Sequence, residues 1–308
     1  TEYWPGKWNQ AGSKYYDLCA ENGIDILYNL NHIYHNATDE GIARFCAKAK
    51  DLSVHRAIVG WYSFDEVTKD WAPFLEKFRR ALEKTTPDKV IWYVNIHEPE
   101  PLLPCGDIQG GDCYPIDVGG RDLVAMDKYV AKCTRCRPAA AWHCPQAMNW
   151  GWYRTPDPER EYRYPTEQEL RNMTWQSVAA GANGLIYYCF HTMRRLLPGD
   201  GYRTEWNKVL KVSGEFTPFF DVFLSVDPHD GLAGAPKGVF TRNWNFRGEE
   251  WALVVNGTNA PKDVALPLGR RYGSASAAFG DALRLDGRTL SGVLPPLGIS
   301  FMKLKGGK

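Results

Sequence analysis

Two adjacent carboxylic acids, Asp65 and Glu66, end the otherwise apolar stretch WYSFDEV (61–67). A carboxyl group among large rings has a raised pKa, because burial disfavours its charged form. Glu66 follows Trp61 and Phe64 in this stretch, which predicts a protonated acid able to give a proton to a leaving group. The alternative is that both acids are polar residues at the point where a buried strand leaves its sheet.

Further polar and aromatic residues lie within or just after other apolar stretches. Asp112 is the second candidate catalytic residue, as nucleophile or base, and Asp65 is the third. The predicted ligand-binding residues share a position in or just beyond an expected strand: Asn31, His32, Trp61, Tyr114, Gln146, Trp150, Trp152 and His191. Structural readings stay open beside these: Asp112 as a loop-capping acid, and His32 and His191 as core histidines.

The elements that must position these residues are strands that alternate with helices. Near-continuous apolar stretches predict strands at 23–32, 56–66, 89–98, 106–116, 137–148 and 183–191. Such stretches are typical of a parallel sheet buried on both faces. Helical patterns lie between most of them, at 14–22, 40–52, 71–85, 121–132 and 165–182. The last of these has a capping box, Thr166 with Glu169, and Gly181 at its C-terminal end.

This alternation indicates the α/β class, either as an open doubly wound sheet or as a closed (β/α)8 TIM barrel. Polar residues gather at the carboxyl ends of the strands, where barrel active sites lie, and no Gly-rich phosphate loop follows any strand. The sequence therefore favours the barrel. Six strand–helix units are visible where a barrel has eight, so we expect the first one or two units to precede Thr1. A six-stranded open sheet is the alternative.

The pattern changes over residues 232–308, which show alternating apolar residues, many turn residues and no helix signal. The stretch NFRGEEW (245–251) predicts a β-hairpin, because two strand-like runs flank a short loop that contains Gly. We therefore predict a barrel domain over 1–231 and a small antiparallel, β-sandwich-like domain over 232–308.

The composition argues against several classes of partner. The 308 residues carry a net charge of +1, from 37 basic and 36 acidic side chains, so neither nucleic acid nor a membrane is expected as a partner. No apolar run reaches the ~20 residues of a membrane span. The 12 Trp and 16 Tyr suit both a protein core and sugar stacking. The oligomeric state and the location stay open, although a secreted or periplasmic location is preferred.

The cysteines raise the question of a metal site. The stretch CTRC (133–136) has the spacing of half a zinc site or of a redox pair. His143 and Cys144 do not complete it, because an extended strand would place Cys144 roughly 20 Å from Cys136. We expect no metal and no cofactor, but reduced core cysteines or one disulfide.

Several stretches together resemble (β/α)8-barrel glycoside hydrolases of the retaining-glycosidase-like superfamily. IVGWYSFDEV (58–67) resembles their fourth strand, which ends in the acid/base Glu, and GIDILYNLNH (23–32) resembles the strand before it. GGDCYPI (110–116) resembles the sixth strand, and YPTEQELRNMTWQSVAAGANGLIYYCF (164–190) resembles the last helix and strand. WALVVNGTNAPKDVALPL (251–268) resembles the small β domain that often follows. The resemblance covers nearly the whole chain and rests on the order of these stretches.

This resemblance implies a carbohydrate substrate, cleavage of glycosidic bonds and Glu66 as general acid/base. Retaining members have a nucleophilic Glu at the end of strand seven, but Gln146 stands there and cannot attack as a carboxylate. Three options remain for the second group. Asp112 acts as nucleophile or base; Asp65 acts beside Glu66 in a substrate-assisted N-acetylhexosaminidase; or Glu98 or Asp112 activates water in an inverting enzyme.

Neighbouring residues of a strand face opposite sides, so only a bend at the strand end would let Asp65 and Glu66 reach one ligand. Two further classes stay open beside the glycoside hydrolase. One is a non-catalytic carbohydrate-binding barrel that has lost its nucleophile. The other is a barrel hydrolase of another substrate class with a metal, although no His-x-His spacing occurs.

Overall fold

The computed structural model describes residues 12–30, 38–95, 99–117, 140–154, 162–225, 228–229 and 231–306. These residues form two compact units. The first unit comprises the described residues up to Gly111 together with Ala140 and Ala141. The second comprises the remaining described residues, from Asp112 onward. The boundary between residues 231 and 232 stays a prediction.

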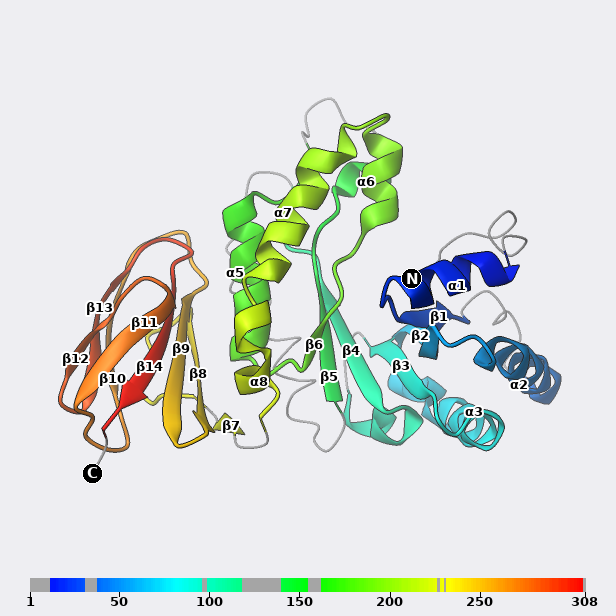
Figure 1. Cartoon of the computed structure of the whole chain (residues 1–308), viewed down its shortest axis with the longest axis horizontal. Helices are drawn as coiled ribbons and strands as arrows, with labels where there is room; N and C mark the ends of the chain where they lie inside the picture. Colours follow the sequence, from blue (N-terminus) through cyan, green and yellow to red (C-terminus); the bar gives the residue numbers. More distant parts are fainter. Residues whose placement is uncertain are drawn as a thin grey trace. The chain divides into compact units, whose positions relative to one another are not determined.

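Six strands of the described chain form one sheet of parallel pairs (Figure 1). They are β1 (Ile26–Asn29), β2 (Ile58–Val67), β3 (Val90–Asn95), β4 (Ile108–Cys113), β5 (Ala140–Pro145) and β6 (Gly184–Leu185). Their order in the sheet is their order in the sequence. A doubly wound sheet reverses this order at a switch point, whereas barrel strands are sequential. The sheet therefore has the (β/α)8 arrangement, and the six predicted strands are confirmed.

Helices follow the strands along the chain. The α-helices are α1 (Gly12–Glu21), α2 (Asp39–Ser53), α3 (Ala72–Thr85), α5 (Glu167–Ala179), α6 (Phe190–Leu196), α7 (Tyr202–Gly214) and α8 (Phe220–Phe223). Short 3-10 helices are η2 (Lys69–Trp71), η3 (Glu100–Cys105), η5 (Trp150–Trp152) and η6 (Thr217–Phe219). The predicted helices at 14–22, 40–52, 71–85 and 165–182 are confirmed, and the one at 121–132 lies outside the described residues.

In the first unit, α2 and α3 bury one apolar face each in the core that also holds β2. The helix α2 begins where the Thr38 hydroxyl accepts a hydrogen bond from the Gly41 N–H at 3.1 Å, which satisfies a donor of the first turn. Phe45 of α2 meets Phe78 of α3 edge to face, with ring centroids 4.9 Å apart. Phe78 in turn meets Phe64 of β2 at 5.1 Å. These ring contacts pack the Phe64 side of β2 against the two helices.

In the second unit, α5 begins with the predicted capping box. The Thr166 hydroxyl accepts from the Glu169 N–H at 3.2 Å, and the Glu169 carboxylate accepts from the Thr166 N–H at 2.8 Å. Arg163 holds the same carboxylate with bonds of 2.6 and 2.7 Å. At the other end, Gly181 has φ +96°, a conformation that glycine adopts without strain. Both sequence signals of this helix are therefore confirmed.

The remaining strands form two antiparallel sheets, in the orders β11-β14-β9-β8-β7 and β10-β13-β12. They are β7 (Pro228–His229), β8 (Val239–Phe246), β9 (Glu249–Asn256), β10 (Lys262–Pro267), β11 (Ser274–Gly280), β12 (Arg284–Asp286), β13 (Thr289–Leu294) and β14 (Ile299–Lys305). Arg247 and Gly248 join β8 to β9 with φ +53° and +78°, as a two-residue type I′ loop requires. The predicted hairpin is confirmed.

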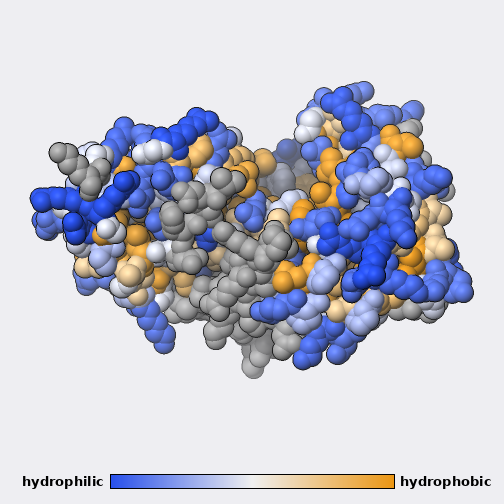
Figure 2. All heavy atoms as spheres, turned by 90° about the horizontal axis from the view of Figure 1, so that it is seen from below, coloured by the Kyte–Doolittle hydropathy of each residue, from blue (hydrophilic) through white to orange (hydrophobic). Residues whose placement is uncertain are grey.

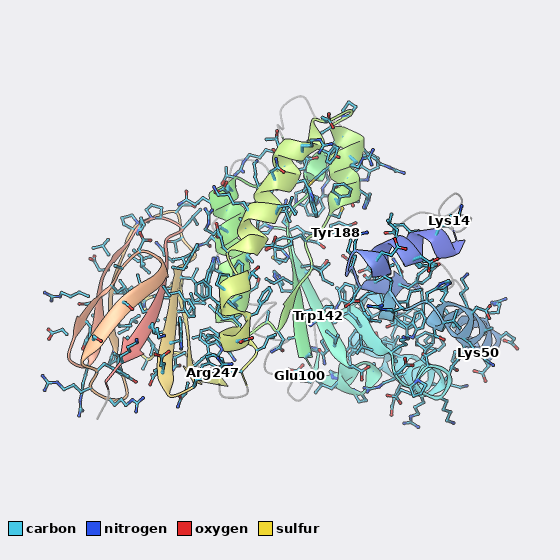
Figure 3. All side chains as sticks on the ribbon, viewed as in Figure 1. Lys14, Lys50, Glu100, Trp142, Tyr188 and Arg247 are labelled. Carbon is cyan, nitrogen blue, oxygen red and sulfur yellow. The ribbon has the colours of Figure 1, made fainter. Side chains whose placement is uncertain are left out.

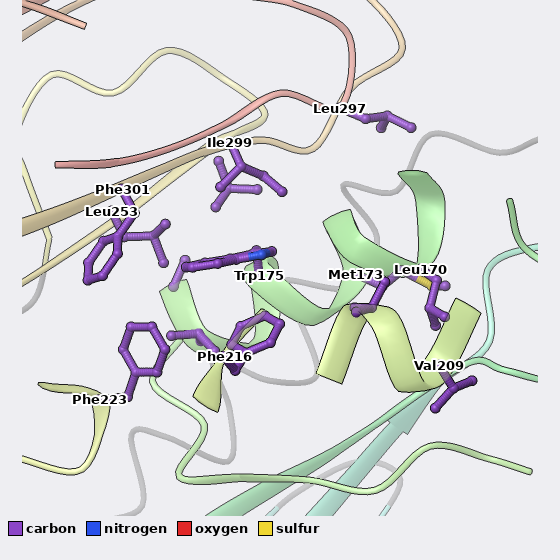
Figure 4. Close-up of a cluster of buried hydrophobic side chains, with 14 of the residues drawn as sticks. Leu170, Met173, Trp175, Val209, Phe216, Phe223, Leu253, Leu297, Ile299 and Phe301 are labelled. Atoms are coloured by element: carbon purple, nitrogen blue, oxygen red, sulfur yellow. The ribbon is translucent and has the colours of Figure 1, made fainter. Parts of the chain in front are cut away.

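The largest core of the second unit lies around α5, where Trp175 is fully buried (Figure 4). Its ring lies 4.5 Å from that of Phe216 and 4.7 Å from that of Phe279, centroid to centroid. Phe223 and Phe301 approach it at 5.8 Å each. The helix therefore packs on one side against α7 and α8 and on another against the five-stranded antiparallel sheet.

In the view of Figure 2, hydrophilic residues cover much of the surface and hydrophobic ones lie between them. Within the described ranges, no helix combines the length and apolarity that a membrane span requires. The six cysteines of these ranges are free thiols, and no group of three His, Cys, Asp or Glu side chains there is placed to hold a metal ion. His143 and Cys144 are successive residues of β5, and Cys133 and Cys136 lie outside the described residues.

Candidate functional site

The first group of candidate residues lies at the carboxyl end of β2, where the strand bulges. Phe64 pairs with Tyr93 of β3 and Val67 pairs with Asn95, so two residues of β2 stand opposite one residue of β3. The two residues of β2 in this bulge are Asp65 and Glu66. A bulge of this kind re-aims side chains and is common beside active sites.

The bulge keeps both acids out of the core that holds their neighbours on either side. Phe64 and Val67 both belong to the buried core beneath the helices, although an unbulged strand would turn residues three apart to opposite faces. Asp65 and Glu66 lie between them and are both exposed. Glu66 has φ +50°, a left-handed conformation that is uncommon and strained for a residue with a Cβ. The bend that the sequence left as a condition is therefore present.

The surroundings raise the pKa of both carboxyl groups, although solvent reaches each side chain. For Glu66 the first cause is removal of water by the neighbouring protein, and the second is the negative charge of Asp65. For Asp65 loss of water also raises the pKa, while hydrogen bonds from the Tyr62 side chain and the Glu66 backbone oppose the rise. An acid that keeps its proton to a higher pH is what a general acid needs.

Large rings fill the space on the same strand face below this pair. The rings of Tyr62 on β2 and Trp92 on β3 lie 4.2 Å apart, centroid to centroid, and both are buried. Gly110 of β4 packs against this layer, because a Cβ there would come within 2.7 Å of the Trp92 indole nitrogen. Strand alternation puts Asp112 on the same face of β4 as Gly110.

Trp61 occupies the opposite face of β2. It is 0% exposed in the core between the sheet and the helices, and its indole N–H donates to the Thr86 hydroxyl at 2.9 Å. A ring without accessible surface offers nothing to a substrate. Trp61, predicted to bind substrate, therefore belongs to the core of the first unit. Asn31 and His32 lie outside the described residues.

The second group of candidate residues lies at or beyond the carboxyl ends of β4, β5 and β6, in the second unit. Asp112 and Tyr114 are half-buried. The neighbouring Cys113 thiol has a pKa raised to about 12, first by burial and then by the negative charge of Asp112.

Four rings form a continuous cluster in this group, which we call the ring cluster: Tyr114, Trp150, Tyr153 and Tyr188. Tyr188 stacks on Tyr114 at 5.4 Å and on Tyr153 at 6.4 Å, each with an interplanar angle of 23°. The hydroxyls of Tyr153 and Tyr188 are 2.6 Å apart, and the Trp150 indole N–H donates to the Tyr114 carbonyl at 3.2 Å. Figure 3 labels Tyr188 just beyond β6. All four rings are partly accessible.

Cationic side chains accompany these rings. The Arg154 guanidinium lies over the Trp150 ring at 4.7 Å, and that of Arg195 lies over the Trp152 ring at 5.3 Å. The His191 ring is 6.2 Å from that of Tyr188. Burial, and then the positive charge of Arg195, lower the pKa of His191, which favours a neutral imidazole.

Gln146 follows β5 at the position where retaining relatives were expected to carry a nucleophile. Its side chain is 0% exposed and bridges the Ile116 backbone: the amide oxygen accepts from the Ile116 N–H at 2.7 Å, and the amide nitrogen donates to the Ile116 carbonyl at 2.6 Å. The same nitrogen donates to the Met148 carbonyl at 3.1 Å. Gln146 thus clamps the segment after β4 onto the end of β5.

A Gln146→Glu variant is expected to be less stable by about 1–3 kcal/mol for each carbonyl that loses its donor. A carboxylate cannot donate to the Ile116 and Met148 carbonyls, so introducing the missing Glu should not create a nucleophile but should loosen this clamp. Urea denaturation of the variant and of Gln168→Glu, which loses only one solvent-exposed bond to the Pro296 carbonyl, measures the difference. Equal midpoints for both variants would contradict the clamp.

The sequence matches no protein-family model and no curated protein. Solved structures do match it. A candidate α-galactosidase/melibiase from Bacteroides fragilis has a TM-score of 0.62 at 15% identity, covering 96% of this chain and 65% of that one. A glycoside hydrolase family 5 protein from Bacteroides vulgatus has a TM-score of 0.61 at 14% identity, covering 99% and 75%. An α-amylase from Geobacillus thermoleovorans has a TM-score of 0.55 at 15% identity, covering 87% and 64%.

The fold is that of the (β/α)8 glycoside hydrolases. The likeness in fold agrees with the resemblance that the sequence showed stretch by stretch. The chain spans 64–72% of the length of the α-amylases that it matches and 65% of that of the α-galactosidase/melibiase. In this glycoside hydrolase fold, Glu66 stands at the end of β2 and the ring cluster beyond β4, β5 and β6.

Two residues of the ring cluster, Tyr153 and Tyr188, were not among the sequence candidates. Tyr188 lies in the stretch IYYCFH, where it alternates with Tyr187, whose hydroxyl lies 3.2 Å from that of Thr174 on α5. Two successive tyrosines at a strand end place one ring on each face, and this signal could have identified Tyr188. Tyr153 stands directly after Trp152 in the stretch NWGWY, where only the tryptophans were selected.

Proposed function

We propose that this protein is a glycoside hydrolase with Glu66 as the general acid/base. The observation that carries the proposal is the bulge at the end of β2, which presents Glu66 with a raised pKa beside Asp65. Cleavage of a glycosidic bond needs such a proton donor for the leaving oxygen. The solved structures of the same fold support this activity class, because their own descriptions name glycoside hydrolases.

Asp112 is the second carboxylate of the proposal, as nucleophile or as base. It lies near the carboxyl end of β4, the end of a strand at which barrel enzymes carry their catalytic residues. Glycoside cleavage by two carboxyl groups uses one as a protonated acid and the other as an ionised nucleophile or base, and the proposal gives Asp112 the second role.

The ring cluster is the proposed sugar-binding platform, together with Trp152 and His191. Sugar rings present C–H faces that pack on aromatic rings, while hydroxyl groups at the rim find polar partners. The stacked rings of Tyr114 and Tyr188 supply such a surface, and the paired hydroxyls of Tyr153 and Tyr188 supply a polar rim. In this proposal Gln146 does not bind the sugar but holds the backbone around Ile116 and Met148 in place.

The substrate-assisted N-acetylhexosaminidase is the second candidate, because Asp65 and Glu66 are both exposed in the bulge and the charge of Asp65 acts on Glu66. In that version Asp65 orients the acetamido group of the substrate, and no protein nucleophile is needed. Hydrolysis of paired aryl N-acetylglucosaminides and aryl glucosides, in both anomeric forms, separates the versions. Preference for the acetamido sugar supports substrate assistance, and equal rates exclude it. Binding without hydrolysis of any aryl glycoside would favour the non-catalytic barrel.

An Asp65→Asn variant is expected to lose activity at a lower pH than the parent. The charge of Asp65 is one of the two causes that raise the pKa of Glu66, so its removal lowers that pKa. Because a general acid works only when protonated, the alkaline limb of the kcat/KM profile on an aryl glucoside then moves to lower pH. Asp70→Asn, on the exposed η2 helix, is the control. If the alkaline limb of Asp65→Asn stays at the parent's pH, the charge of Asp65 does not set the pKa of Glu66.

A further inference from the structure

Two arginine side chains lie over the rings of the two tryptophans of η5. The Arg154 guanidinium is 4.7 Å from the centre of the Trp150 ring, and that of Arg195 is 5.3 Å from the centre of the Trp152 ring. Both arginines are exposed. A tryptophan that stacks on a neutral sugar offers an open ring face, whereas each of these rings has a cation over one face. A ligand that approaches η5 therefore meets positive charge as well as aromatic surface.

These cations border the ring cluster from two elements of the second unit. Trp150 of η5 meets Tyr114 edge to face, with centroids 6.1 Å apart. Arg195 belongs to α6, which begins two residues after Tyr188. Burial is the first cause that lowers the pKa of His191, and the positive charge of Arg195 is the second. Since the His191 ring is 6.2 Å from that of Tyr188, this charge acts beside the proposed sugar platform.

Arg154 forms no ion pair with any carboxylate that the structure describes. Arg163, by contrast, holds the Glu169 carboxylate at 2.6 Å and so takes part in the start of α5. The ring contact keeps Arg154 in place, which lowers the entropic cost of binding a ligand through it. Its planar fork of N–H donors fits a carboxylate or a sulfate, because either group accepts two of these donors side by side.

We propose that the saccharide bound at the ring cluster carries an anionic group, a carboxylate or a sulfate ester, and that Arg154 binds this group. The inference rests on the proposed function, because it names the substrate class of the same site. An anionic group projects from the rim of a sugar ring, while the C–H face of that ring stacks on aromatic side chains. Arg195 adds positive charge from α6. A neutral saccharide would give the Arg154 fork no anionic partner.

Isothermal titration of the full chain in a Glu66→Gln background tests this preference without consuming the probe. Pectin and alginate hexasaccharides carry carboxylates, and a κ-carrageenan hexasaccharide carries sulfate esters. The methyl esters and the desulfated form are the neutral counterparts. At least one anionic probe should bind about tenfold or more tightly than its neutral counterpart, and Arg154→Gln should remove the difference. Added salt should narrow it, because the arginine is exposed. The probe that binds distinguishes a carboxylate from a sulfate ligand.

Arg284→Gln is the matched control, because Arg284 is an exposed arginine of β12, outside the ring cluster. It should keep the full preference, whereas Arg154→Lys, which keeps the charge but not the fork, should keep only part of it. An anionic preference that survives in Arg154→Gln overturns the inference, and so does equal or absent binding of all anionic probes.

Hydrolysis of the same probes by the Glu66 parent, measured as new reducing ends, is scored separately. Tight anionic binding without cleavage would contradict the proposed activity and support the anionic site. Cleavage of the neutral forms at the rate of the anionic ones, with equal affinity, would support the activity and overturn the anionic site.

Discussion

A Glu66→Gln variant is expected to lose about 10²–10⁴-fold in kcat/KM on an aryl glycoside with a poor leaving group, such as phenol. Gln preserves the size of the side chain but cannot donate a carboxylic proton to the leaving oxygen. The parent must first be screened with both anomers of several phenyl glycosides, because the sugar is not fixed by the structure. Initial rates across pH then measure the loss, and the alkaline limb of the profile should disappear with it.

The leaving group makes this test specific for proton donation. The 2,4-dinitrophenolate group leaves its glycoside without protonation. The same variant should therefore lose far less kcat/KM on the 2,4-dinitrophenyl glycoside than on the phenyl glycoside. Glu40→Gln, an exposed acid in the first turn of α2, is the control for charge removal. Equal losses on both leaving groups would assign Glu66 a binding role instead of the acid role. Parent-like rates on the phenyl glycoside would remove it from the mechanism.

Trp175→Ala is expected to lower the free energy of unfolding by about 3–5 kcal/mol. The indole ring is fully buried among five phenylalanine rings, and packed surroundings close only part of the volume that such a ring leaves. The midpoint of urea denaturation, followed by far-ultraviolet circular dichroism, measures the loss. It should be accompanied by a lower thermal midpoint.

Trp71→Ala is the matched control for this prediction. Trp71 is 41% exposed on η2 and meets other rings only at centroid distances above 6 Å, so its removal should cost about 1 kcal/mol or less. A loss in Trp175→Ala no larger than in Trp71→Ala would mean that the core around α5 contributes little to stability.

Local signals predicted the elements of this chain well. The six parallel strands are apolar stretches that the sequence shows directly, and Thr166 with Glu169 predicted the start of α5 by chemistry confined to four residues. The hairpin at Arg247 and Gly248 is likewise local. The sequential order of the strands in the sheet could not be predicted, because it depends on pairings between residues far apart in the chain. The polar residues at the strand ends favoured the barrel only indirectly.

The candidate site was predictable only in part, for the same reason. Phe64 and Val67 are apolar residues three apart with two acids between them, a spacing compatible with a bulge. The bulge itself and the left-handed conformation of Glu66 follow from the pairing of β2 with β3, which the sequence does not show. Gln146 looked like a ligand for substrate because its partner, Ile116, lies 30 residues earlier. Trp61 looked accessible because a single strand does not tell which face meets the helices.

The burial of α5 on more than one side has a consequence for the dynamics of the second unit. Ser177 bonds His143 of β5 at 2.7 Å, whereas Asn172 donates to the Asn256 and Leu297 carbonyls of the antiparallel region at 2.9 and 3.0 Å. The amides of α5 can exchange with deuterium only when these contacts open together. We therefore expect α5 and β9 to exchange as one slow cooperative group. A chain cut before β8 should lose protection in α5 itself.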